Sequence, residues 1–230
     1  RNAVFKGACI KCANEIVYIL GLTGSIGMGK TTAARAFKNL GIPVYDADAT
    51  IHRIMNENSA VVAAIKNIFP KAVKKNSIDR IILGSIVFEN ISALKELEKI
   101  LHPCAKALQY KFMRCAAKNR YNMIVLDIPL LYETKGDQFC DAVIVVSAPS
   151  FIQRSRVFAR DNMTEKKFIE ICNRQLSDKE KRLKANYIIP TGLGKGVSLV
   201  YIKKIIQDVK TKNSCKWLPG KGIYIETNST

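Results

Sequence analysis

The sequence has no long uninterrupted hydrophobic run. About 18 or more consecutive apolar residues would be needed for a membrane-spanning helix, and no such run occurs, although 48% of the 230 residues are hydrophobic. The apolar stretch 16–22 is short and leads directly into a glycine-rich loop. This setting is typical of a buried strand and not of the core of a signal peptide. We therefore expect a globular cytoplasmic protein without a membrane partner.

Cysteine spacing that would support a disulfide framework is also missing. The seven cysteines are an odd number at irregular intervals, which indicates free thiols in a reducing compartment. Cys9 and Cys12 have the C-x-x-C spacing of metal and redox sites, but no second C-x-x-C pair exists to complete a zinc site. Structural zinc at this pair is the weaker interpretation.

Acidic residues are scarce. The 19 Asp and Glu residues stand against 37 Lys and Arg residues, so the formal net charge is +18. Such a charge is typical of proteins whose partners are polyanions, including nucleic acids and phosphorylated small molecules. The lysines are scattered, with short clusters at 71–75 and 179–184, and no aromatic residues alternate with arginines. Anionic small molecules are therefore the expected ligands, and nucleic acid is the weaker alternative.

One motif dominates what the sequence does contain. Gly24 is followed by four residues and then by Gly29-Lys30-Thr31, which is the P-loop pattern G-x-x-x-x-G-K-[ST]. A strand is expected before it and a helix over 30–40, so backbone amides and the helix dipole would face bound phosphates. Lys30 would reach the β- and γ-phosphates, and the Thr31 hydroxyl would hold Mg²⁺. The sequence therefore predicts a nucleoside triphosphate site.

A P-loop alone does not separate kinases from GTPases and motor ATPases. Residues 134–137 read T-K-G-D and match the guanine-binding pattern [NT]-K-x-D. However, no D-x-x-G switch motif precedes them, and no apolar strand leads into them. A GTPase is therefore the weaker alternative, and the choice between ATP and GTP stays open.

Strands alternate with helices along the chain, which predicts a parallel sheet covered on both faces. The five expected strands are 16–22, 42–45, 123–127, 142–147 and 187–189. Residues from 49 to about 119 give no strand signal, and helices are expected there at 61–69, 80–88, 93–101 and 105–117. Residues 150–185 are also expected to be helical, with Ser177 and Glu180 forming a capping box. We predict a three-layer α/β fold with two helical insertions.

Two carboxylates follow the second expected strand. Asp46 and Asp48 lie two residues apart at the edge of the sheet where ligands bind in such folds. His52 lies four residues after Asp48, on the same face if a helix begins there. A carboxylate in this place either caps the helix or receives the proton of a hydroxyl that accepts phosphate. The sequence by itself leaves both roles open.

Taken in order, the motifs resemble those of the dephospho-CoA kinase family. The similar segments run from Ile19 to Lys210 and read LTGSIGMGKTT, GIPVYDAD with His52 following, IDRIILGSIVF, LHP, VLDIPLLYE, RVFARD and ANYIIP. The resemblance implies a P-loop kinase that phosphorylates the ribose 3′-hydroxyl of dephospho-CoA with ATP, the last step of coenzyme A biosynthesis. A P-loop kinase for another small acceptor, such as a nucleoside monophosphate, and a nucleic-acid-associated ATPase are the alternatives.

The resemblance also implies roles for individual residues. Asp48 is the expected base or orienter of the acceptor hydroxyl, and Lys30 and Arg156 would stabilise the transferring phosphate. Asp127 would help to hold Mg²⁺ together with Thr31. The residues expected at ATP are Gly24, Gly27, Met28, Gly29, Lys30, Thr31 and Thr32. The residues expected at dephospho-CoA are Asp48, His52, Arg80, His102, Pro129, Leu130 and Arg160.

The same resemblance divides the chain into parts. The expected parts are an N-terminal extension (1–15), a P-loop nucleotide-binding core with a five-stranded parallel sheet (16–48, 120–149 and 186–210), a helical acceptor-binding domain (49–119), a helical lid (150–185) and a C-terminal tail (211–230). Two positions depart from the family pattern, because Asn186 stands in place of Asp and Thr191 in place of Asn. Both are expected near the adenine end of the ATP site. The oligomeric state stays open.

Overall fold

The computed structural model describes residues 17–74, 77–161, 163–212 and 214. The chain divides into two compact units, one formed by Arg1–Tyr45 with Met113–Thr230 and the other by Asp46–Phe112. We call them the core unit and the helical unit. The expected N-terminal extension with Cys9 and Cys12, and nearly all of the expected tail, lie outside the described residues. Among the described residues, every helix is too short or too polar to cross a membrane.

The core unit contains a five-stranded sheet in the order β2-β5-β1-β6-β7. Its strands are β1 (Tyr18–Thr23), β2 (Val44–Asp46), β5 (Met123–Asp127), β6 (Ala142–Ser147) and β7 (Tyr187–Pro190). Strand β1 pairs in parallel with both β5 and β6, and β6 pairs in parallel with β7. All five expected strands are confirmed: β5 and β6 have the expected ends, and the ends of the other three differ by at most two residues.

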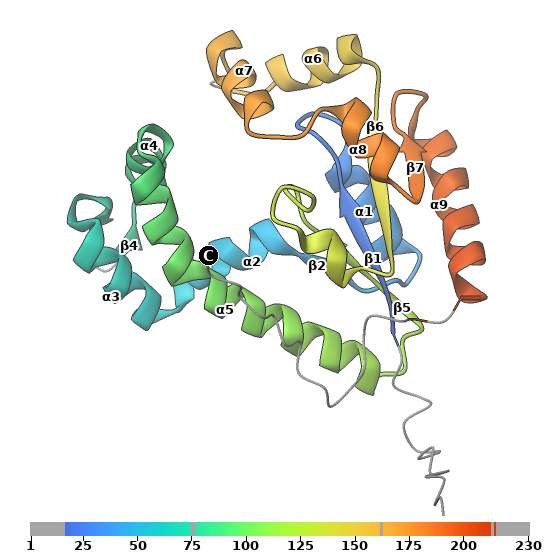
Figure 1. The fold of residues 1–230 in the computed structure, drawn as a ribbon, viewed down its shortest axis with the longest axis horizontal. Helices are drawn as coiled ribbons and strands as arrows, with labels where there is room; N and C mark the ends of the chain where they lie inside the picture. The colour runs from blue at the N-terminus through green and yellow to red at the C-terminus, as the bar shows by residue number, and fades with distance from the viewer. Residues whose placement is uncertain (1–16, 75–76, 162, 213, 215–230) are drawn as a thin grey trace, which may run out of the picture. The chain divides into compact units, whose positions relative to one another are not determined.

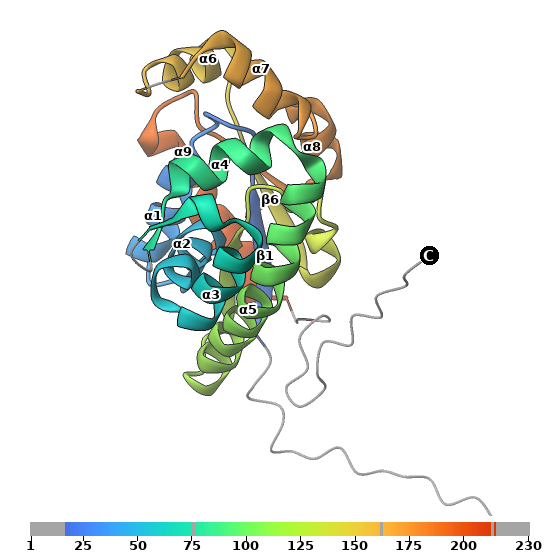
Figure 2. The same ribbon diagram turned by 90° about the vertical axis from the view of Figure 1, so that its left-hand side faces the viewer.

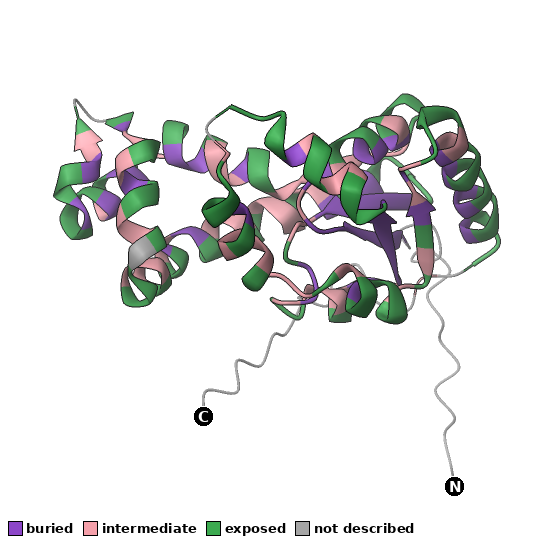
Figure 3. Cartoon of the chain, turned by 90° about the horizontal axis from the view of Figure 1, so that it is seen from above, coloured by how far each residue is buried: buried purple, intermediate pink, exposed green. Residues whose placement is uncertain are grey.

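Burial explains why the central strands are almost entirely apolar. Every residue of β1, β5 and β6 is buried, as is typical of a parallel sheet covered on both faces. Helices α1 (Lys30–Asn39) and α9 (Lys195–Lys210) pack together and supply Phe37 and Ile202 to the same core as Leu22 and Ile144. Figure 1 shows these two helices beside the sheet, and Figure 3 shows the buried strands in purple between mainly exposed outer helix faces.

The segment after β6 forms three short helices of the core unit (Figure 2). They are α6 (Ser150–Phe158), α7 (Glu165–Asn173) and α8 (Asp178–Lys184). Arg154 joins α6 to α7 through an ion pair of 2.9 Å with Glu165, and Phe158 and Phe168 meet edge to face with ring centroids 5.6 Å apart. The capping box at the start of α8 is confirmed.

The helical unit has its own hydrophobic core. It contains α2 (Ala47–Glu57), α3 (Ser59–Ile68), the 3₁₀ turn η2 (Pro70–Ala72), strands β3 (Val73–Lys74) and β4 (Ser77–Ile78), α4 (Arg80–Glu89) and the first part of α5 (Ile91–Lys118). The side chains of Asp46, Asn58 and Asp79 cap α2, α3 and α4 by accepting from backbone amides. Caps of this kind stabilise a helix by about 1 kcal/mol each. Buried Ile54 and Ile65 belong to the core of the unit.

Two expectations for this region are wrong. Residues 49–119 do contain strands, because β3 and β4 pair antiparallel with Val73 opposite Ile78; two-residue strands are too short to show an alternating pattern. The expected break near residue 103 is also absent, since α5 continues through Pro103. Proline removes one backbone donor from a helix and disfavours its interior, but Leu97, Leu101 and Leu108 on both sides of it pack into the apolar core. Tertiary packing therefore overrides the local signal.

Candidate active site

The P-loop connects β1 to α1. Gly27 and Gly29 have φ values of 76° and 86°, a left-handed conformation that glycine adopts without the strain other residues incur. Gly29 is the N-cap residue of α1, and no side chain there accepts a hydrogen bond from the first turn. The first amides of a helix lack partners within the helix and carry its positive dipole. This end of α1 can therefore accept an anion such as a phosphate.

Lys30 and Asp127 form an ion pair beside this loop. Lys30 Nζ lies 2.5 Å from Asp127 Oδ1, and the two side chains are 16% and 5% exposed. The pairing register places Asp127 opposite Leu22, one residue before the end of β1. Both groups therefore lie at the carboxyl edge of the sheet, where ligands bind in folds of this type.

The oxygen donors at this edge fit a magnesium ion that is carried by phosphates. Thr31 is exposed at the start of α1, and Asp127 is a buried carboxylate. Mg²⁺ uses one or two protein oxygens and completes its octahedron with phosphate oxygens and water. Among the described residues, no group of three or more His, Cys, Asp or Glu side chains could form a complete protein cage. The donor set suits a metal that arrives with the nucleotide.

Arg156 is attached to the P-loop through Thr191. Its Nη2 donates to the Thr191 carbonyl (2.7 Å), and its Nη1 donates to the Thr191 hydroxyl (3.2 Å) and to the Gly27 carbonyl (3.5 Å). The Thr191 hydroxyl in turn donates to the Met28 carbonyl at 2.7 Å. The structure thus brings Arg156 of α6, the P-loop and the residue after β7 together, whereas Arg160 lies beyond the end of α6 and is exposed.

The two departures from the family pattern lie at different ends of β7. Thr191 follows the carboxyl end, next to the P-loop. Asn186 precedes the amino end, where its side chain accepts from the Val143 amide at 2.8 Å and its own amide donates to the Val143 carbonyl at 3.0 Å. Asn186 therefore lies at the opposite end of β7 from Thr191 and the P-loop. Asn186 extends the pairing of β6 with β7.

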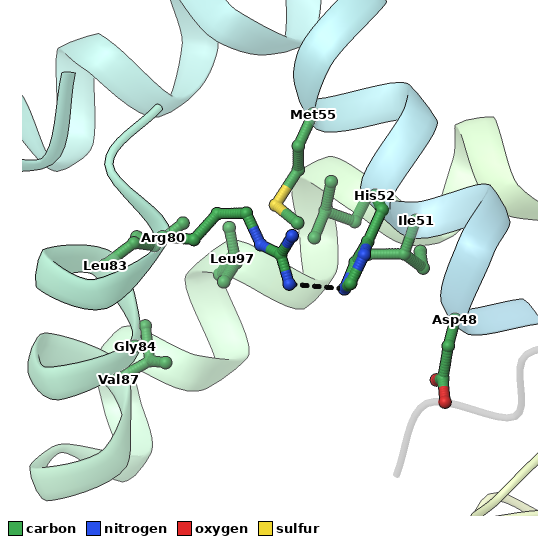
Figure 4. A pocket seen from close by; sticks show the side chains of 10 residues that line it. Asp48, Ile51, His52, Met55, Arg80, Leu83, Gly84, Val87 and Leu97 are labelled. Carbon is green, nitrogen blue, oxygen red and sulfur yellow. Dashed lines mark hydrogen bonds between the residues drawn. The ribbon is translucent and has the colours of Figure 1, made fainter. Parts of the chain in front are cut away.

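The helical unit holds a cavity of about 250 Å³ with polar groups along one side (Figure 4). Asp48, His52 and Arg80 supply the polar lining, and α2, α4 and α5 supply apolar walls that include Met55 and Leu83. Arg80 Nη2 lies 2.7 Å from His52 Nε2. Because a guanidinium can only donate, Nε2 of His52 is the acceptor in this contact.

The two aspartates after β2 have different surroundings. Asp46 accepts from the Ala49 amide at 2.9 Å and is the N-cap of α2. Asp48 lies in the first turn of α2, is exposed and lines the cavity. The capping role that the sequence left open therefore belongs to Asp46. The carboxylate of Asp48 is available to a ligand in the cavity.

The remaining expected acceptor residues are more dispersed. His102 is exposed in the middle of α5, and the lining of the cavity does not include it. Pro129 and Leu130 follow β5 in the core unit; the Pro129 carbonyl accepts from the Thr23 hydroxyl at 2.9 Å, and Leu130 is exposed.

Three residues that sequence reasoning missed contact this region of the core unit. Lys181 is fully buried, with Nζ 3.0 Å from Glu133 Oε1 and 3.4 Å from the Pro129 carbonyl. Gln153 and Gln175 form hydrogen bonds with the backbone of Ile26 in the P-loop. No local pattern marks these residues, since their partners lie far away in the sequence. From the sequence alone, a glutamine beside or within an amphipathic helix cannot be told from an ordinary solvated side chain.

The sheet, the P-loop with its lysine, and the helices after β6 that carry an arginine to the loop define a P-loop kinase. Within this class, the chain belongs to the dephospho-CoA kinase family, whose sequence model matches residues 18–193.

Known relatives agree with this assignment. The dephospho-CoA kinase of Rhodospirillum rubrum is 42% identical over 207 residues, which cover 90% of this chain and 98% of that protein. That of Paramagnetospirillum magneticum is 48% identical, with 71% and 77% covered. Among solved structures, TT1252 from Thermus thermophilus is 29% identical with a TM-score of 0.76, and 86% of this chain and 100% of that one are covered. A dephospho-CoA kinase from Campylobacter jejuni is 28% identical with a TM-score of 0.57, covering 83% and 96%.

Proposed function

We propose that the core unit binds ATP with Mg²⁺ and that the helical unit holds dephospho-CoA, whose ribose 3′-hydroxyl takes the γ-phosphate to give coenzyme A and ADP. The observation that carries this proposal is the P-loop with its Lys30–Asp127 pair at the carboxyl edge of the sheet, in a chain that belongs to the dephospho-CoA kinase family. The amides at the start of α1 suit a triphosphate, and the polar side of the helical cavity suits a phosphorylated ribose.

In the proposed reaction the acceptor O3′ bonds to the γ-phosphorus while the bond from that phosphorus to the β,γ-bridging oxygen breaks. The proton of the 3′-hydroxyl passes to the Asp48 carboxylate, and ADP leaves. Asp48 can serve this purpose because it is exposed and does not cap its helix. A positioned carboxylate of this kind accounts for roughly 10²–10⁴-fold in rate.

The cationic side chains of the core unit would stabilise the negative charge of the phosphates during transfer. Lys30 would bridge the β- and γ-phosphates after exchanging part of its contact with Asp127, and Arg156 would neutralise charge that spreads over the transferring group. Magnesium would be held by Thr31 and, through water, by Asp127, and it would neutralise phosphate charge when bound. Fixed cations cost little reorganisation during the reaction, which is the main source of catalysis in phosphoryl transfer.

Dephospho-CoA would contact the polar side of the helical cavity. The Arg80 guanidinium offers further donors beyond the one directed at His52, and it can bind a phosphate of the acceptor. The apolar walls of the cavity suit the less polar part of the acceptor. His102 of α5 is a further residue proposed to contact dephospho-CoA, and in the core unit the same is proposed for Arg160, Pro129 and Leu130.

An acceptor screen tests the proposed function. The purified chain is incubated with Mg²⁺ and either ATP or GTP, and nucleoside diphosphate release is measured with dephospho-CoA, AMP, CMP, dTMP and shikimate. We expect release only with dephospho-CoA, together with coenzyme A as the product in mass spectrometry. Faster release with a nucleoside monophosphate would assign the chain to another small acceptor. Release stimulated by an oligonucleotide would favour a nucleic-acid-associated ATPase.

Replacement of Asp48 tests the catalytic assignment. Asp48→Asn keeps the size of the side chain and removes its basicity, so we expect kcat to fall by about 10²–10³-fold with little change in the KM for ATP. The matched control is Asp46→Asn, because asparagine caps helices about as well as aspartate. We expect this control to keep kcat within about threefold of the parent. Equal kcat values in both variants would remove Asp48 from the proposed chemistry.

A further inference from the structure

Two glutamine side chains hold the backbone of one P-loop residue. Gln153 Nε2 donates to the Ile26 carbonyl at 2.8 Å, and the Ile26 amide donates to Gln175 Oε1 at 3.0 Å. A backbone N–H can only donate and a carbonyl can only accept, so these partners determine which atom of each side-chain amide faces the loop. Gln153 therefore acts as a donor and Gln175 as an acceptor.

The glutamines come from different parts of the segment after β6. Gln153 lies in the middle of α6, and Gln175 follows the end of α7 by two residues. Helix α6 also fills the space beside the next loop residue: a Cβ atom on Gly27 would lie 2.6 Å from Val157 Cγ2 and 3.0 Å from the Gln153 carbonyl. The P-loop is thus packed directly against α6.

The same arrangement continues along the loop. The carbonyl of Ile26 accepts from Gln153, that of Gly27 accepts from Arg156, and that of Met28 accepts from Thr191. In a planar trans peptide the N–H of the following residue points away from the carbonyl. Holding the Ile26 and Met28 carbonyls on the protein side therefore directs the amides of Gly27 and Gly29 to the opposite side.

We propose that Gln153 and Gln175 are positioning residues that preset the P-loop for the triphosphate. Gln153 turns the peptide between Ile26 and Gly27 so that the Gly27 amide faces the phosphates, and Gln175 anchors the other polar group of Ile26. Because Gln153 lies in α6 and Gln175 lies in the connection between α7 and α8, the loop geometry depends on how this segment packs against the P-loop. This inference rests on the proposed ATP site and adds two residues to it.

The donor and acceptor roles make opposite predictions for the same substitution. Gln153→Glu places a carboxylate against the Ile26 carbonyl, whereas Gln175→Glu keeps an acceptor for the Ile26 amide. We expect the dissociation constant of ATP, measured by titration calorimetry, to rise at least about tenfold in Gln153→Glu, the size expected for an unpaired backbone group. In Gln175→Glu it should stay within about threefold, and Gln175→Met should weaken binding as Gln153→Met does.

Controls separate positioning from general destabilisation. Gln138→Glu adds the same charge at an exposed glutamine of the 3₁₀ turn Gly136–Phe139 and should bind ATP as the parent does. The KM for dephospho-CoA should stay within about twofold in all folded variants. Circular dichroism melts check folding, and Gln153→Met replaces Gln153→Glu if the latter does not fold.

The outcomes show separately whether the inference fails and whether the proposed function fails. If the parent chain binds no ATP, the proposed function fails. If the parent binds ATP and the folded Gln153 variants bind it equally well, the inference is overturned, whatever their melting temperatures. Equal weakening by Gln153→Glu and Gln175→Glu would also overturn it, because the assigned donor and acceptor roles would then have no effect.

Discussion

The hydroxyl of Thr191 is buried between the P-loop and the Arg156 guanidinium. It donates to the Met28 carbonyl and accepts from Arg156, so one oxygen connects the loop to the arginine proposed to stabilise the transferring phosphate. A hydroxyl can supply both the donor and the acceptor that these two neighbours need.

Thr191→Val tests this connection, because valine keeps the branched shape and lacks the hydroxyl. Both neighbours lose a partner, and leaving a buried polar group unpaired costs about 1–3 kcal/mol. We expect kcat to fall about tenfold or more in a steady-state assay. Thr191→Ser retains the oxygen and should stay within about threefold of the parent. If the valine and serine variants have the same kcat, the hydroxyl has no part in positioning Arg156.

At the scale of elements, helix α8 combines an exposed cap with a buried lysine. Glu180 accepts from the Ser177 hydroxyl (2.6 Å) and the Ser177 amide (2.9 Å), and Ser177 accepts from the Glu180 amide (3.2 Å). On the other side of the helix, Lys181 pairs with Glu133. The same short helix is thus closed at its start by local hydrogen bonds and held to the loop after β5 by a buried ion pair.

The cap predicts a pH dependence of stability. Hydrogen bonds from the hydroxyl and the amide of Ser177 lower the pKa of Glu180. A lowered pKa in the folded state stabilises the fold above the unfolded pKa of about 4.3, and this contribution disappears as the pH falls through the folded pKa. In thermal melts, Glu180→Gln should have a lower Tm than the parent at about pH 7, and the difference should shrink toward about pH 3.

The control for this experiment is Glu170→Gln, which changes a half-buried glutamate of α7 that is not part of a helix cap. Its Tm difference from the parent should vary less with pH. A Glu180→Gln deficit that stays constant from about pH 7 to about pH 3 would contradict the ionised capping box.

At the scale of the whole molecule, the positive charge is unevenly divided between the two units. Residues 46–112 contain ten Lys and Arg residues and seven Asp and Glu residues, so nearly all of the net charge of +18 belongs to the rest of the chain. This remainder includes the P-loop and its lysine. The excess therefore accompanies the proposed triphosphate site and not the acceptor cavity.

This distribution of charge predicts that the binding of ATP and the binding of dephospho-CoA depend differently on salt concentration. Dissolved ions shorten the range of electrostatic attraction from about 10 Å at 0.1 M to about 3 Å at 1 M. We expect the KM for ATP to rise more steeply than the KM for dephospho-CoA as KCl is increased from about 0.05 M to about 0.5 M, with kcat changing less. Equal slopes for the two substrates would show that the charge division does not affect binding.

The order of the strands explains how the helical unit interrupts the core. The chain leaves the sheet after β2 and returns at β5, and these two strands are neighbours in the order β2-β5-β1-β6-β7. An insertion between neighbouring strands leaves the central pairing of β1 with β5 and β6 intact. The helical unit has a hydrophobic core of its own, so it does not depend on the sheet for burial of apolar surface.

The sequence by itself determined the class of fold, the P-loop, the five strands of the mostly parallel sheet and the capping box of α8. These features rest on local signals: apolar runs of strand length, glycines at set spacing before a lysine, and a serine three residues before a glutamate. The motifs in their order also indicated the family. Such signals are readable because the groups that interact are close together along the chain.

Only the tertiary structure decided which side chains hold the P-loop and which polar residues are buried. Ile26 and Gln175 are 149 residues apart, and Met28 and Thr191 are 163 apart. The burial of Lys181, the continuity of α5 through Pro103 and the position of Asn186 at the amino end of β7 depend in the same way on segments distant in sequence. A hydrogen bond depends on the distance and the direction between donor and acceptor in space. For residues in separate helices and strands, the number of residues between them along the chain determines neither quantity.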